Sequence, residues 1–78
     1  MKDPVEYQKA LGQAITDRRE RLGYTREKLA RIIGVDGDYV AFVEDGRNDL
    51  ELSEMLVMAR ALEIPLSTLL ALAESALL

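Results

Sequence analysis

Residues 25–46 read TREKLARIIGVDGDYVAFVEDG, and the expected fold follows mainly from these residues. Its apolar residues recur at intervals of three and four, which predicts two short helices over about residues 26–33 and 37–45. Between them stands Gly34-Val35-Asp36. Glycine adopts the left-handed backbone that ends a helix, and aspartate accepts a hydrogen bond from the first turn of the next helix. The stretch therefore predicts two helices joined at a steep angle by a short turn.

The side chains of this stretch divide into capping and inward positions. Thr25 and Asp36 are the expected N-caps of the two helices. Val35 is expected to fill the angle between the helices, and the small Ala30 lets them approach closely. The positions expected to be buried are Leu29, Ala30, Ile33, Val40 and Val43.

The same helical period continues on both sides of this stretch. It predicts further helices over about residues 4–22, 52–62 and 66–76, with no strand-like alternation. The helix over residues 52–62 carries an apolar stripe at Leu52, Met55, Leu56, Ala59 and Leu62. Because 78 residues suffice for only one small core, we expect residues 1–78 to form a single all-α domain.

Composition excludes several classes of function. The chain contains neither cysteine nor histidine, so disulfides and thiolate metal sites are excluded, and the commonest nucleophile and general base are missing. We therefore expect no enzyme, no metal and no cofactor. The first residues, MKDPVE, lack the apolar run of a signal peptide, and no apolar stretch is long enough to span a bilayer. We expect a cytoplasmic protein that does not enter a membrane.

Charge is distributed unevenly along the chain. Residues 1–33 hold eight basic and five acidic side chains, whereas residues 34–78 hold two basic and nine acidic ones. The net charge is −4, although affinity for DNA phosphates comes from lysine and arginine. Any contact with DNA has to rely mainly on the basic first part.

A longer ordered series of residues extends the central stretch to about residues 11–70. It comprises Leu11-Gly12, Ile15, Arg19, Gly23-Tyr24-Thr25-Arg26-Glu27-Lys28-Leu29-Ala30, Gly34-Val35, Tyr39-Val40, Val43-Glu44-Asp45-Gly46-Arg47, Met58-Ala59-Arg60-Ala61-Leu62 and Leu66-Ser67-Thr68-Leu69-Leu70. This series resembles the Xre-type, Cro and phage-repressor helix-turn-helix family. The resemblance implies a compact five-helix, lambda-repressor-like domain that regulates transcription by binding double-stranded DNA as a homodimer.

The resemblance also implies which residues contact DNA. In the family, the helix equivalent to residues 37–45 enters the major groove. By position, the contact residues fall on Arg26, Gly37, Asp38 and Phe42, with support from Lys28, Arg47 and Asn48. A further family feature, an ion pair between the first helix and the recognition helix, falls on Arg19 and Glu44. Arg18 stands where the family usually has an apolar residue, and its side chain is expected to extend past the edge of the core.

The expected recognition helix departs from the family in its charge. Asp36, Asp38, Glu44 and Asp45 lie in or beside it, with no lysine or arginine between them. Phe42, the only phenylalanine, is expected to face outward, to pack on a thymine methyl group or to form a protein-binding patch with Tyr39. An inward Phe42 on a rotated helix is a third possibility. The alternative function is therefore a protein-interaction module with weak or no DNA binding.

The last helix has more leucine than one buried face can hold. Leu66, Leu69, Leu70 and Leu72 cover more than a third of its circumference. The excess predicts a homodimer contact through Leu69, Leu72 and Leu77. A frayed apolar terminus is the simpler alternative for the end of the chain.

Overall fold

The computed structural model describes residues 3–77, which form five helices and no strand. The helices are α1 (Pro4–Arg21), α2 (Arg26–Ile33), α3 (Gly37–Glu44), α4 (Leu52–Ala61) and α5 (Leu66–Ser75). The expected all-α class and the expected five helices are confirmed. Each helix starts where the sequence predicted, and four end one residue earlier because the last predicted residue is the C-cap.

Local hydrogen bonds explain where the helices begin. The side chains of Asp3, Thr25 and Asp36 accept bonds from backbone N–H groups in the first turns of α1, α2 and α3. The start of α4 is closed by a capping box, in which Glu51 is the N-cap and the Glu54 carboxylate accepts from the Glu51 N–H. At the other end of α2, Gly34 has a φ of 81°, which only glycine adopts readily.

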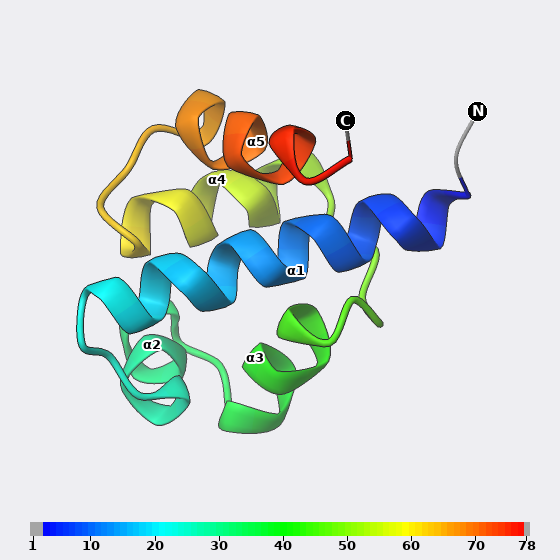
Figure 1. Ribbon diagram of the computed structural model, residues 1–78. Coiled ribbons are helices and arrows are strands. Elements are labelled where there is room, and N and C mark those ends of the chain that lie inside the picture. Colours follow the sequence, from blue (N-terminus) through cyan, green and yellow to red (C-terminus); the bar gives the residue numbers. More distant parts are fainter. Residues whose placement is uncertain (1–2, 78) are drawn as a thin grey trace.

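Helix α1 runs through the middle of the protein (Figure 1). Figure 1 shows α2 and α3 on one side of α1 and α4 and α5 on the other. The apolar core fills the space between the two sides. Its most deeply buried large side chains are Ile15, Leu29, Val40, Met58, Leu62 and Leu69.

A close helix contact fixes α3 against α1. A Cβ atom added at Gly12 on α1 would lie 2.5 Å from the carbonyl oxygen of Val43 and 2.6 Å from that of Glu44. Real side chains do not approach backbone this closely, so only glycine lets the end of α3 reach α1. This contact brings Glu44 to the surface of α1 that carries Arg19.

Two expectations about apolar packing are wrong. Leu52 and Leu56 are 62% and 51% exposed, because α2 and α5 cover only one side of α4 and its inward residues are Met58, Ala59 and Leu62. Val35, at 37% exposure, does not fill the angle between α2 and α3 but lies at its rim.

The expected interface residue Leu69 also needs correction. Leu69 is fully buried in the core of its own chain, so it cannot meet a second copy. Leu77 is half-buried against the same core. Of the three residues expected at the dimer interface, only Leu72 is exposed.

Candidate nucleic-acid interface

The residues predicted to contact DNA come from three neighbouring segments. Arg26 and Lys28 lie in the first turn of α2. Helix α3 carries Gly37, Asp38 and Phe42, and Arg47 and Asn48 follow it. The backbone N–H of Arg47 donates to the carbonyl of Phe42, which holds the start of the loop against α3. The residues Arg26, Lys28, Asp38, Phe42 and Arg47 are exposed, whereas Gly37 and Asn48 are half-buried.

The outer side of α3 carries one large apolar side chain. Phe42 is 51% exposed, so the outward orientation is the one found and a rotated helix with Phe42 in the core is wrong. Tyr39, three positions earlier on α3, extends toward α4. It is half-buried, and its hydroxyl donates to Glu54 on α4 at 2.8 Å. Burial, and then this hydrogen bond, raise the pKa of Tyr39 to about 12. The Tyr39 hydroxyl is therefore engaged within the protein, and Phe42 is the more exposed of the two aromatic side chains.

A buried carboxylate connects three helices beside this surface. The Glu44 side chain is only 1% exposed and accepts hydrogen bonds from two arginines. Arg19 on α1 donates through Nε at 2.6 Å and through Nη2 at 3.1 Å, so the expected Arg19–Glu44 pair forms a two-point contact. Arg26 on α2 donates through Nε at 2.9 Å, a contact that the sequence did not indicate.

Glu44, Arg19 and Arg26 form a cluster whose opposite charges partly compensate one another. Burial alone would raise the pKa of the Glu44 carboxyl, but hydrogen bonds from Arg19 and Arg26 outweigh it and hold that pKa below its ordinary value. The hydrogen bond to Glu44 raises the pKa of Arg19. Glu44 is therefore ionised in the folded protein at neutral pH, and the cluster carries one net positive charge.

Lys28 is directed to a different contact. Its ammonium lies 4.9 Å from the centre of the Tyr24 ring, a distance suited to a cation–π interaction. Tyr24 belongs to the turn between α1 and α2. Lys28 thus contacts this turn, whereas Arg26 contacts α3.

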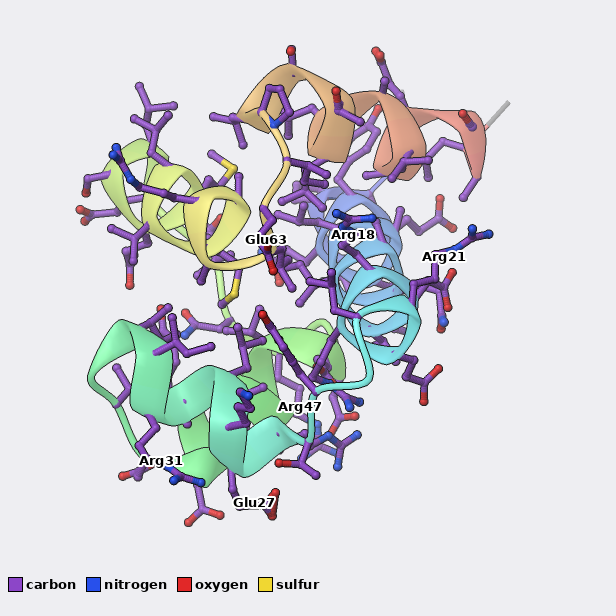
Figure 2. All side chains as sticks on the ribbon, turned by 90° about the vertical axis from the view of Figure 1, so that its left-hand side faces the viewer. Arg18, Arg21, Glu27, Arg31, Arg47 and Glu63 are labelled. Carbon is purple, nitrogen blue, oxygen red and sulfur yellow. The ribbon has the colours of Figure 1, made fainter. Side chains whose placement is uncertain are left out.

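Arg18 has a structural role that the sequence left without an explanation. Its Nε donates to the carbonyl of Leu62 at 2.8 Å, at the C-terminal end of α4 where helix carbonyls lack partners. Figure 2 shows Arg18 beside Glu63 in the turn from α4 to α5, and the Glu63 carboxylate accepts from the Tyr24 hydroxyl at 2.7 Å. Arg18 therefore ties the end of α1 to the α4–α5 turn rather than to DNA.

Two negative findings apply to residues 3–77. No group of three aspartate, glutamate, histidine or cysteine residues in this range is arranged to hold a metal ion. No single helix there has the length and apolar character to cross a membrane. Helices α4 and α5 reach that length only in combination, and a 98° bend separates them.

Comparison with known proteins shows the family of this chain. A family model described as a helix-turn-helix domain matches residues 10–72, so the chain belongs to that family. No curated protein matches the chain. Helix-turn-helix domains place their second helix in the major groove, and this chain is a DNA-binding regulator of transcription.

Solved structures of similar proteins share the fold. The clp gene regulator ClgR from Corynebacterium glutamicum is 25% identical, with a TM-score of 0.88 over 92% of each chain. The restriction-modification controller protein C.AhdI from Aeromonas hydrophila is 32% identical, with a TM-score of 0.81 over 87% of this chain and 99% of its own. A hypothetical transcription factor from Neisseria, NHTF, is 31% identical, with a TM-score of 0.82 over 99% of this chain and 88% of its own. The resemblance indicated by the sequence is confirmed.

Proposed function

We propose that this regulator binds DNA as a homodimer through the first turn of α2, the outer side of α3 and the loop after α3. The observation that carries the proposal is the Arg26 side chain, which Glu44 holds beside α3 while 46% of its surface stays exposed. Arginine in this position offers charge-assisted hydrogen bonds to a phosphate or a guanine. The similar solved structures are of regulators, which supports the same function.

The other proposed contacts have complementary roles. Phe42 suits contact with a thymine methyl group, and the Asp38 carboxylate suits a cytosine N4 amino group. Arg47 and Lys28 supply positive charge near the DNA phosphates. Gly37 allows the protein backbone to approach the DNA closely, and Asn48 offers a side-chain amide for hydrogen bonds. Because residues 32–46 contain no lysine or arginine, few basic groups reach phosphate and the salt dependence of binding should be shallow.

For the homodimer, we propose the exposed side of α4 as the interface. Leu52, Leu56 and Val57 are each more than half exposed on this helix. Burying each leucine would contribute about 1.5–3 kcal/mol before the costs of association. A two-fold dimer doubles every such contact and presents two copies of α3 to successive major grooves, roughly 34 Å apart.

Sedimentation of Leu56→Glu and Leu72→Glu over a concentration series tests this assignment. Both leucines are about half exposed, at 51% and 49%, but they lie on α4 and α5 respectively. The proposal expects dissociation of the dimer by Leu56→Glu alone. Dissociation by Leu72→Glu alone would show that α5 forms the interface instead. A wild-type protein that stays monomeric at high micromolar concentration would contradict the homodimer.

Protein binding is the second candidate function, and the exposed Phe42 favours it. Phe42 is bordered by the acidic Asp38 and Asp45, which would repel phosphates but suit a basic partner. In this case the helix-turn-helix is a scaffold, with weak or no DNA binding. For either function we propose a single domain that lacks catalytic activity and acts in the cytoplasm.

A titration with mixed-sequence duplex DNA separates the two functions. Fluorescence anisotropy at two salt concentrations should show binding at low salt, with a small loss of affinity as salt rises. Folded protein without measurable DNA affinity at low salt would exclude the first function and leave protein binding.

A further inference from the structure

Arg19 and Arg26 use their donors very differently, although both contact Glu44. Arg19 engages all three of its nitrogens, since Nε and Nη2 donate to Glu44 and Nη1 donates to the Tyr24 carbonyl. Arg26 engages Nε alone, and its two terminal nitrogens make no hydrogen bond to residues 3–77. The Arg19 side chain is 10% exposed, whereas that of Arg26 is 46% exposed. Arg19 is a structural group, and Arg26 keeps donors for another acceptor.

The contact with Glu44 restricts where those free donors lie. A guanidinium is planar, so holding the Nε–H group restricts the directions in which the terminal N–H groups point. A free arginine side chain loses rotamer entropy when it is immobilised. Here part of that loss is incurred on folding, so less remains to be lost when an anion binds.

Glu44 itself is rigidly held. Its carboxylate is buried, Arg19 grips both oxygens, and Gly12 keeps the end of α3 against α1. The anchor of Arg26 therefore belongs to the buried part of the protein.

We propose that buried Glu44 is a positioning residue for DNA binding, which holds Arg26 so that its terminal nitrogens donate to a backbone phosphate. This inference rests on the proposed function, because it specifies how that site binds DNA. Glu44 does not touch the nucleic acid and acts only through Arg26. The contact is with phosphate, so it operates on duplexes of any sequence.

The proposal makes the opposite prediction from simple charge counting. Removing one negative charge from an acidic protein should strengthen its binding to DNA. If Glu44 positions Arg26, then Glu44→Gln instead weakens binding. Glu74→Gln provides the control for charge, because Glu74 is exposed on α5, on the other side of α1 from the proposed DNA-binding surface (Figure 1).

A double-mutant cycle measures the effect directly. The affinities of wild type, Glu44→Gln, Arg26→Ala and the double variant are measured by anisotropy with a mixed-sequence duplex at several salt concentrations. Arg26→Ala should lose about tenfold in affinity, as expected for one hydrogen bond to a charged group. The slope of log affinity against log salt concentration should become shallower by about one, as expected for the loss of one phosphate contact. Glu44→Gln should lose several-fold in the presence of Arg26 and nothing further in its absence.

Two control variants separate positioning from general effects. Arg31→Ala removes the same charge from α2 at an exposed position about 140° further around the helix, and should change affinity less than Arg26→Ala. Glu74→Gln should leave affinity unchanged or raise it slightly. Equal losses for Glu44→Gln with and without Arg26 would overturn the proposal and indicate a purely structural role. A gain in affinity for Glu44→Gln would overturn it as well.

A second measurement keeps the proposal testable if Glu44→Gln does not fold. In the wild-type protein, the NMR signal of the Arg26 Nε–H should be protected from solvent exchange, and binding of the duplex should add protection at the terminal nitrogens. An unprotected Nε–H, or terminal nitrogens unaffected by DNA, would overturn the proposal. If wild-type protein binds no DNA at low salt, the proposed function fails instead.

Discussion

The two sides of α1 are built in different ways. On the side of α2 and α3, polar contacts fix the arrangement: Glu44 joins three helices, and Gly12 allows backbone contact between α1 and α3. On the side of α4 and α5, the polar contacts are single hydrogen bonds, such as that from Arg18 to the Leu62 carbonyl, and leucines such as Leu52 and Leu72 remain on the surface. A surface that must match DNA needs defined directions for its donors, whereas a self-associating surface needs apolar area. The difference indicates that the two proposed activities occupy opposite sides of α1.

The largest expected effect compares a buried leucine on one side with an exposed leucine on the other. Leu29 of α2 is fully buried, whereas Leu56 of α4 is 51% exposed. Leu29→Ala should lower the free energy of unfolding by about 2–5 kcal/mol, because it leaves a cavity. Leu56→Ala should cost about 0.5 kcal/mol or less in a monomer. Chemical denaturation at a protein concentration too low for association measures both, and similar losses would mean that the sides are not distinct.

The second prediction concerns the close approach of α1 and α3. Gly12→Ala places a methyl group against two backbone carbonyls, and should cost about 1–3 kcal/mol because neither helix can yield without losing other contacts. Gln13→Ala, at the exposed neighbouring position, is the control and should change stability by less than about 0.5 kcal/mol. Thermal unfolding of both variants decides, and an unchanged melting temperature for Gly12→Ala would show that the contact is loose.

The smallest expected effect is on the pH dependence of stability. The pKa of Glu44 is lower in the folded protein than its ordinary value of 4.5. The carboxylate therefore contributes stability that is complete above pH 4.5 and is lost as the pH falls below it, toward the folded pKa. Urea unfolding from pH 7 down to pH 3 should show this loss in wild type and a weaker loss in Glu44→Gln.

Glu54 supplies the control for that measurement. Hydrogen bonds from the Glu51 N–H and the Tyr39 hydroxyl also lower the pKa of Glu54, so its contribution has the same sign. Glu54 lies on the α4 side and is not part of the Glu44 cluster. If the pH profile of stability changes in Glu54→Gln but not in Glu44→Gln, the acid sensitivity comes from the α4 side and not from Glu44, which contradicts the prediction.

Features that depend on neighbouring residues were predictable from the sequence. The caps at Thr25 and Asp36 and the glycine turn at Gly34 need only a few consecutive residues, and each is found where expected. The Arg19–Glu44 pair spans 25 positions, and only the family resemblance indicated it.

Features that depend on packing between distant segments were not predictable in the same way. Which face of α4 is exposed depends on which helices cover it. Helical periodicity alone therefore placed Leu52 and Leu56 on the buried face, although both are exposed. Arg18 reaches a carbonyl 44 positions away, a contact that no local pattern contains. Gly12 is needed because of a backbone approach rather than a turn. Arginine spacing likewise gave no sign that Arg26 shares Glu44 with Arg19.

NMR can map DNA binding onto individual backbone amides. Titration of isotope-labelled protein with a mixed-sequence duplex at low salt should shift the NMR signals of residues 26–28, 37–42 and 47–48, and leave residues 52–57 of α4 unchanged. Shifts concentrated on α4 and α5, or no shifts at all from folded protein, would contradict the assignment of DNA binding to the side of α1 that carries Arg26.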